Sequence, residues 1–276
     1  MGAGRGASWR TLGAVVVLVV FAAPLVIMVP GSLREPGLPP PRTPELLPDP
    51  VVFSNYARAV DLAGLGRATV NSVVVAALAV PLSVLVASWA GFALLQLSRR
   101  LARALIAASF VALMVPLTAL LVPRFAIFRA LGLTDTLVPL IAPALVATSP
   151  VYVLVYYLAF RQLPRDLWDA CRIEGMSPLR TWRRVAMPLV RPVTAAVAAL
   201  VFVLTWANFL DPLVYIYRRD LFTLPLALRS LATVDPTNYP LLLAGAVIAT
   251  APVVAVFLLA QRWFLHEHRG LGWLGR

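Results

Sequence analysis

Six long apolar runs, separated by polar stretches, constrain the fold of this chain more than any other feature. About 20 apolar residues in a helix cross the ~30 Å hydrocarbon core of a bilayer, and each run approaches or exceeds that length. Hydrophobic residues make up 61% of the chain and charged residues 13%, whereas a soluble domain is about half apolar and a quarter charged. The sequence therefore predicts an all-α integral membrane protein, a single transmembrane domain over residues 1–276, with six transmembrane helices at 12–30, 70–95, 104–123, 137–160, 193–217 and 241–264.

The first run raises the question of a signal peptide, because Arg5 and Arg10 precede it. The run is long, however, and it lacks a clear small-x-small cleavage site. We therefore expect an uncleaved first span that tolerates Pro24. A stiff, proline-rich connection follows over residues 31–67, and a short surface helix is expected to begin near Phe53 within it.

The distribution of arginine predicts the orientation in the membrane, since cytoplasmic loops carry an excess of basic residues. All 24 basic residues are arginine. With the N-terminus inside, the inner segments hold fifteen of them and the outer loops nine. Both termini are therefore expected in the cytoplasm, together with the polar stretch of residues 161–192. A polar loop over residues 218–240 is expected outside.

The stretch between the fourth and fifth runs reads RQLPRDLWDACRIEGMSPLRTWRRVAMPLVRP, and its pattern predicts two short helices. The first is expected to begin near Asp166, with Asp169 three residues on in an approximate capping box. Gly175 then suits a helix stop, where a left-handed residue turns the chain. Ser177 suits the N-cap of the second helix, followed by a proline at its first position. That helix is expected to end before Pro188.

The two helices and the glycine corner would form a compact cytoplasmic unit, and the first helix would offer an apolar surface. The residues expected on that surface are Leu167, Trp168, Ala170 and Cys171. From spacing alone, however, the stretch also fits an ordinary positive loop between two membrane spans.

The order Asp169-Ala170-Cys171, then Gly175, then Met187-Pro188 resembles the EAA loop of binding-protein-dependent ABC importer permeases. The family pattern is Glu-Ala-Ala, three residues, Gly and a distant Leu-Pro, so Asp, Cys and Met are substitutions here. In that family the loop is a coupling helix that docks into a cytoplasmic ATPase. The resemblance implies ATPase-coupling roles for Asp166, Leu167, Trp168, Asp169, Ala170, Cys171, Glu174 and Gly175.

Other segments resemble the sugar-class permeases of maltose-permease type, namely 114–145, 206–213 and 222–225. The resemblance implies a permease in the bacterial cytoplasmic (inner) membrane. Its partners would be a second permease subunit, two copies of a cytoplasmic ATP-binding subunit, an extracytoplasmic solute-binding protein and membrane lipid. The solute would be a sugar, an oligosaccharide or a related polyol phosphate. No cofactor is expected in this chain, because the ATPase subunits would use the ATP.

A few polar residues inside the apolar runs are candidates for the path of the solute. They are Asn208 and Asp211 near the outer end of the fifth run, with Thr118, Ser149 and Thr205. Two plainer interpretations stay open. Asp211 would lie at the water interface and cap a helix end. Ser and Thr in membrane helices commonly bond to backbone or to a neighbouring helix.

Several functional classes lack their motifs in this sequence. There is no GxxxxGK[ST] phosphate loop, no HExxH and no GxSxG, and the single cysteine excludes a disulfide or a cysteine metal cluster within the chain. The basic residues behind the net charge of +12 lie between apolar runs and not on one soluble face. Nucleic acid is therefore not expected as a partner. A membrane-embedded enzyme or scaffold using the same polar loop remains the alternative. It would need a nucleophile, base or metal cluster near one membrane face.

Overall fold

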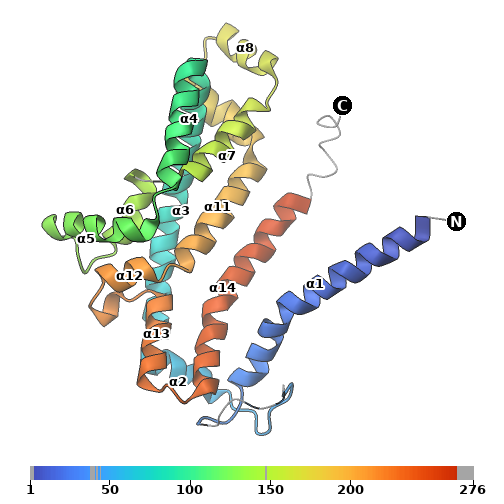
Figure 1. The fold of residues 1–276 in the computed structure, drawn as a ribbon, viewed down its shortest axis with the longest axis vertical. Helices are drawn as coiled ribbons and strands as arrows, with labels where there is room; N and C mark the ends of the chain where they lie inside the picture. The colour runs from blue at the N-terminus through green and yellow to red at the C-terminus, as the bar shows by residue number, and fades with distance from the viewer. Residues whose placement is uncertain (1–2, 38–40, 42, 44, 147, 266–276) are drawn as a thin grey trace. The chain divides into compact units, whose positions relative to one another are not determined.

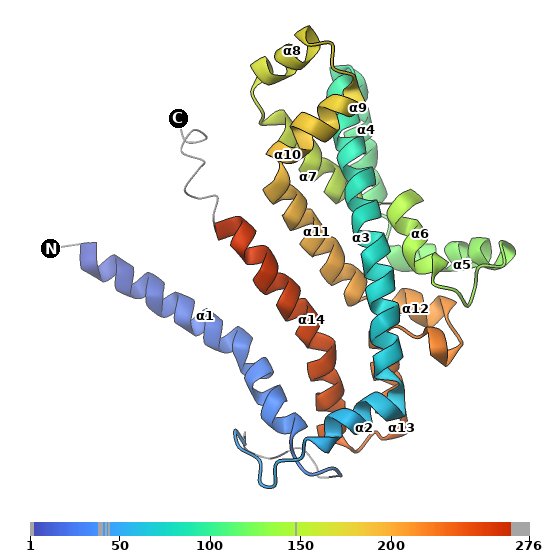
Figure 2. The same ribbon diagram turned by 180° about the vertical axis from the view of Figure 1, so that it is seen from behind.

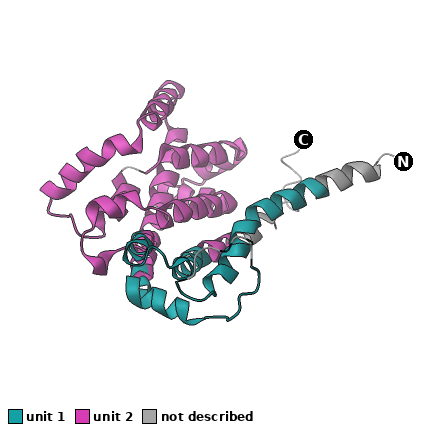
Figure 3. Cartoon of the chain, turned by 60° about the horizontal axis from the view of Figure 1, so that its bottom comes forward, with its two compact units in different colours: residues 1–68, 226–252 teal, residues 69–225, 253–276 magenta. Residues whose placement is uncertain are grey.

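The computed structural model describes residues 3–37, 41, 43, 45–146 and 148–265. Over these residues it is helical, with no strand, which confirms the all-α class. The chain divides into two compact units (Figure 3). Residues 1–68 and 226–252 form unit 1, and residues 69–225 and 253–276 form unit 2.

Unit 1 contains α1 (Ala3–Ser32), α2 (Ser54–Ala63), most of α13 (Leu224–Val234) and the first half of α14 (Tyr239–Leu265). The side-chain amide of Asn55 is buried and donates to the carbonyls of Ser32 at 2.9 Å and Arg34 at 2.7 Å. This pair of bonds ties α2 to the end of α1. The expected surface helix is therefore present, but one of its polar residues points inward.

Unit 2 is built on α3 (Leu65–Gln96), α4 (Arg99–Leu113), α7 (Pro150–Arg161) and α11 (Arg191–Trp206). Figures 1 and 2 show α7 lying beside α4 and α11. The core between the helices contains Ala87, Phe92, Tyr156, Phe160, Ala186, Val190, Val197 and Val201.

Gly91 marks the place where α3 crosses α7 at close range. A Cβ atom at Gly91 would lie 2.8 Å from the Cβ of Tyr156 and 2.9 Å from the backbone oxygen of Val153. Real Cβ atoms do not approach backbone this closely, so any side chain would force the helices apart. Glycine therefore fixes this crossing.

Shorter elements complete unit 2, and several of them pack around Tyr215. They are η1 (Leu117–Leu120), α5 (Leu121–Ala130), α6 (Val138–Val146), α12 (Leu210–Tyr215) and η3 (Arg219–Leu221). Tyr215 is fully buried. Its ring stacks on Phe125 and meets Phe128 edge-on, with centroid distances of 6.3 and 5.4 Å. These contacts hold α5 against α12.

Four helical segments are long and apolar enough to cross a membrane, or up to six if each of two sharply bent helix pairs counts as one span. The four are Thr11–Ser32, Leu65–Gln96, Val138–Arg161 and Tyr239–Leu259. The predictions of continuous helices over 104–123 and 193–217 were wrong. In the first, α4 ends at Leu113 and the chain bends by 86°, because Pro116 adopts an extended backbone that cannot continue a helix.

In the second, α11 ends at Trp206, and a new helix begins at Leu210. Asn208 accounts for the break, because its side chain bonds the first turn of the next helix. The expected polar loop over 218–240 was also partly wrong, since residues 224–234 form α13. A single Arg229 does not prevent this helix, because its buried residues recur at helical spacing. These residues are Leu224, Leu226, Ala227 and Leu231.

Candidate functional site

Helix α3 places two polar regions of unit 2 far apart. Asn71 contacts one near the start of the helix, and Gln96 lines the other at its end. At ~1.5 Å per residue, these two residues are about 37 Å apart along the helix, which is more than the ~30 Å thickness of the hydrocarbon core. The region at Gln96 belongs to residues 161–192, which we call the knuckle, and the region at Asn71 to residues 216–224, which we call the clamped loop. A span of this length is long enough to place the two regions on opposite faces of a membrane.

The first helix of the knuckle is α8 (Arg165–Ile173), and it begins one residue before Asp166. Pro164 occupies the N-cap, which has no side-chain cap hydrogen bond, so the expected capping box was wrong. Asp166 instead lies in the first turn, where a negative charge suits the helix dipole. Asp169 pairs with Arg172 at 3.3 Å.

The corner of the knuckle is as the sequence predicts. Gly175 has a left-handed φ of +64°. Its N–H donates to the carbonyl of Arg172, and the N–H of Met176 donates to that of Cys171, both at 3.0 Å. This is the Schellman arrangement of a helix end. Ser177 accepts from the backbone N–H of Arg180 at 3.4 Å and so caps the next helix.

The second knuckle helix does not end before Pro188. It runs as α9 (Pro178–Thr181), a π-helical turn (Trp182–Ala186) and α10 (Met187–Leu189). The N–H of Met187 bonds to the carbonyl of Trp182, five residues back. This wider turn admits the proline, which would clash in a regular α-helix. The chain then bends by 85° into α11.

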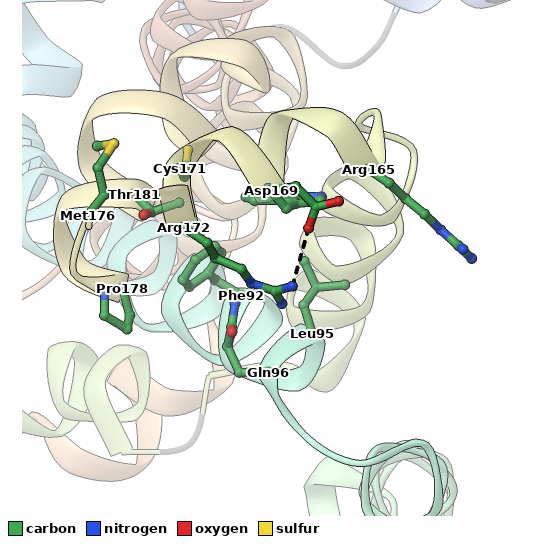
Figure 4. Close-up of a pocket in the computed structure, with 11 residues that line it drawn as sticks. Phe92, Leu95, Gln96, Arg165, Asp169, Cys171, Arg172, Met176, Pro178 and Thr181 are labelled. Atoms are coloured by element: carbon green, nitrogen blue, oxygen red, sulfur yellow. Dashed lines mark hydrogen bonds and ion pairs between the residues drawn. The ribbon is translucent and has the colours of Figure 1, made fainter. Parts of the chain in front are cut away.

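The expected apolar surface of α8 faces inward over much of its area. The ring of Trp168 lies 5.9 Å from that of Phe92, and Cys171 is buried. A cavity of about 320 Å³ separates α8 from the end of α3 (Figure 4). Its lining includes Phe92, Leu95, Gln96, Arg165, Trp168, Asp169, Cys171, Arg172, Met176, Pro178 and Thr181.

The solvent side of the knuckle carries apolar residues that sequence reasoning missed. Ile173 is 87% exposed and Leu179 58% exposed. Asp166, Asp169 and Ala170 are exposed too, whereas Leu167 is half-buried. Residues three, four and seven apart share one face of a helix, so this spacing could have placed Ile173 beside Asp166 and Asp169. Glu174 and Gly175 are exposed at the corner.

Asp211 lies at the start of α12, in a polar cluster that joins two helices. The side-chain amide of Asn208 donates to Asp211 at 2.9 Å, and its oxygen accepts the backbone N–H of Asp211 at 3.2 Å. Asn208, one residue before the N-cap Phe209, therefore bonds the first turn of α12, and Asp211 does not cap the helix. Arg124 of α5 pairs with the Asp211 carboxylate at 3.3 Å and lies 5.8 Å from the ring centre of Tyr215. Arg124 was not among the residues predicted from the sequence.

The other three candidates for a solute path lie in separate settings. Thr118 is exposed in η1, and Thr205 is half-buried in α11. Ser149 caps α7 by accepting from the N–H of Val151 at 3.4 Å. Within the residues that the structure describes, none of these three side chains hydrogen-bonds to the Asn208–Asp211 pair.

Polar side chains hold the clamped loop from two sides. The carboxylate of Asp135 accepts the backbone N–H groups of Tyr217 at 3.0 Å and Arg218 at 2.9 Å. Asn71 donates to the carbonyls of Asp220 at 2.8 Å and Phe222 at 3.0 Å. Ser72 of α3 also accepts from the N–H of Leu224 at 2.8 Å.

The exposed part of the clamped loop carries Tyr217, Arg218 and Arg219. Arg218 forms a two-pronged contact with the carboxylate of Asp220, and this contact raises the pKa of Arg218 above its ordinary value. In the described part of the chain there is no group of three or more metal-ligating side chains. His266 and His268 lie outside the described residues.

Comparisons with known proteins connect this geometry to a family. Residues 79–267 match the model of the binding-protein-dependent transport system inner membrane component. The arabinooligosaccharides transport system permease protein AraQ of Halalkalibacterium halodurans is 33% identical, covering 94% of this chain and 93% of that protein. The trehalose transport system permease protein SugB of Mycobacterium tuberculosis is 30% identical, covering 95% of each.

A solved structure shares the fold. A bacterial ABC transporter involved in the import of alginate superposes with a TM-score of 0.78, at 19% identity, covering 96% of this chain and 99% of that chain. The relatives are permeases, which favours transport over the membrane-enzyme alternative. The chain therefore belongs to the family of binding-protein-dependent transport system inner membrane components, the ABC importer permeases that its polar stretch resembles.

Proposed function

We propose that this chain is the transmembrane subunit of an ATP-driven importer for a sugar, an oligosaccharide or a related polyol phosphate. A binding protein outside the membrane delivers the solute, and the chain pairs with a second permease. Two copies of an ATPase bind at the cytoplasmic face and use the ATP, so this chain needs no cofactor. The named sugar relatives support the solute class.

The observation that carries the proposal is the position of the knuckle. It packs on the end of α3 through Trp168. Ile173 and Leu179 are exposed, and Asp169, at the rim of the cavity beside α3, is exposed as well. A short rigid helix with a charged and apolar outer face suits docking into a cleft of another protein. Movement of the ATPases would then pass through the knuckle into α3 and α11 and alternate the opening of the path.

The orientation follows from the arginine distribution. The knuckle and both termini lie in the cytoplasm, and the clamped loop lies outside. The Asn208–Asp211–Arg124 cluster is the polar part of the solute path that we propose, because it is partly buried and joins α5 to α12. Thr118, Ser149 and Thr205 are lesser candidates, since they stand apart from it.

Reconstitution tests the whole proposal. The chain is co-expressed with a second permease, an ATPase and a binding protein from the same genome, and the purified assembly is placed in liposomes. We expect ATP-dependent accumulation of a sugar that the binding protein binds, and none without ATP or without the binding protein. Failure of the chain to co-purify with the ATPase would overturn the proposal.

A further inference from the structure

A groove of about 420 Å³ lies where the knuckle joins α11. Its lining combines two arginines with apolar and small residues, namely Arg183, Met187, Pro188, Arg191, Thr194, Ala195 and Ala198. The groove is distinct from the cavity behind α8, and neither the coupling contact nor the polar cluster uses it. Its two kinds of lining match the two parts of an amphiphilic molecule.

The charged part of the groove is available to a ligand. Arg183 and Arg191 are both exposed, and within the described residues neither forms an ion pair. A guanidinium group presents a planar fork of donors that matches a phosphate. The hydroxyl of Thr194 already bonds to the carbonyl of Val190 at 3.2 Å, so the cationic pair is the anion-recognising part.

The apolar part of the groove continues along α11. Arg191, Ala195 and Ala198 stand four and seven residues apart, so they share one face of the helix. The small alanine side chains leave room for a hydrocarbon chain to lie against the helix. Arg191 is the first residue of this apolar helix, which places it at the level of lipid headgroups.

We infer that this groove binds one anionic phospholipid of the cytoplasmic leaflet, with its phosphate on Arg183 and Arg191 and an acyl chain along Ala195 and Ala198. Charge complementarity selects the occupant, because the inner leaflet is negative and basic pockets on that side of membrane proteins bind anionic headgroups. The inference rests on the orientation given in the proposed function. A bound lipid would brace the 85° bend between α10 and α11.

Lipid binding to the full chain in detergent tests the inference without any need for transport or for an ATPase. Native mass spectrometry compares phosphatidylglycerol with phosphatidylcholine of the same acyl chains, and a third arm adds inorganic phosphate as a competitor. We expect retention of phosphatidylglycerol over phosphatidylcholine, with little competition by millimolar phosphate. Equal retention of the two lipids, or full competition by phosphate, would overturn the lipid assignment.

Variants localise the site. Arg183→Gln or Arg191→Gln should weaken phosphatidylglycerol binding about 5-fold each, and the double variant about 25-fold. The double lysine variant keeps the charges and should keep most of the preference. Arg100→Gln removes an exposed arginine of the same membrane face and should change nothing. An unchanged lipid preference in the double glutamine variant would place the lipid elsewhere.

The acyl-chain half of the inference has its own variant. Ala198→Leu fills the groove without a change of charge, and we expect weaker retention of phosphatidylglycerol. Ala107→Leu, in the exposed middle of α4, is the matched control. Full retention by the Ala198→Leu chain would show that no acyl chain lies there and would refute the inference.

Discussion

The knuckle and the clamped loop are both polar and both contact α3, yet different forces hold them in place. The knuckle rests on α3 through apolar contacts, chiefly Trp168 against Phe92, and the charged side chains of α8 are exposed to solvent. The clamped loop is fixed by hydrogen bonds from Asn71, Ser72 and Asp135 to its backbone. Apolar contacts tolerate small sliding, whereas directional bonds do not. The region that we propose transmits movement and the loop that is held by directional bonds are therefore built differently.

The largest expected effect concerns the orientation, which puts the knuckle in the cytoplasm and the connection over residues 31–67 outside. In a Cys171→Ser background, a cysteine in place of Glu45 should react with a membrane-impermeant reagent from outside. A cysteine in place of Arg180 should react only after the membrane is opened. Labelling of whole cells and of inverted vesicles measures this. The reverse pattern would invert the orientation and move the knuckle away from the ATPase.

The next largest effect concerns Asp169. If it meets a basic group of the ATPase in a partly desolvated contact, loss of the charge costs about 2–5 kcal/mol. If it serves only its exposed pair with Arg172, the loss is about 0–1 kcal/mol. We expect Asp169→Lys to abolish assembly with the ATPase and Asp169→Ala to weaken it strongly. Asp169→Glu should be tolerated.

Pull-down of the ATPase in detergent, with solute-stimulated ATP hydrolysis, distinguishes the two values. Wild-type assembly by the Asp169→Lys chain would move the contact to other outward residues of the knuckle. Ile173→Ser and Leu179→Ser then become the variants to test, because both side chains are largely exposed.

Asp135 tests the clamped loop. Asp135→Ala removes the acceptor for two backbone N–H groups and places alanine at a φ of +59°. We expect about 1–3 kcal/mol less stability for the loop, seen as faster hydrogen exchange over residues 216–224. Asp135→Asn keeps an acceptor and tolerates the left-handed backbone, so it is the control. ATPase assembly should be unchanged, and its loss would contradict the separation of the two regions.

Gly175 gives the smallest effect, at the corner of the knuckle. A Cβ there meets nothing within 4 Å, so only the left-handed backbone opposes a side chain. Gly175→Val should cost about 1–2 kcal/mol, with transport falling while membrane insertion persists. Gly175→Asn, which tolerates this backbone, should retain most transport. Normal transport by a well-inserted Gly175→Val chain would show that transport does not depend on the left-handed corner.

Part of this structure could be predicted from short sequence patterns. The glycine corner and the Ser177 cap depend on neighbouring residues alone, and both were predicted. The end of the second knuckle helix was not, because the π-helical turn that admits Pro188 has no local signature in residue type. Pro116 and Asn208 are residue types that commonly end helices. The two spans were nevertheless predicted as continuous helices, because the surrounding residues are apolar.

The polar cross-links could not be predicted, because their members are distant in the sequence. Arg124 pairs with Asp211, Asp135 accepts from the backbone of Tyr217, and Asn71 donates to the carbonyl of Phe222. The sequence alone shows each of these residues only as a polar residue near the end of an apolar run. The inward side of α8 was missed for the same reason, since Phe92 lies far from Trp168 in the chain.

The close crossing at Gly91 gives α3 a mechanical property. A helix held against α7 at this point would act as a lever with unequal arms, about 7.5 Å from Gly91 to Gln96 and about 30 Å from Gly91 to Asn71 at ~1.5 Å per residue. A shift of about 1 Å at the short arm, under the knuckle, would swing the far end by about 4 Å. The closest approach of the two helices is at Gly91, so the position of this residue in α3 would set the ratio of the two arms.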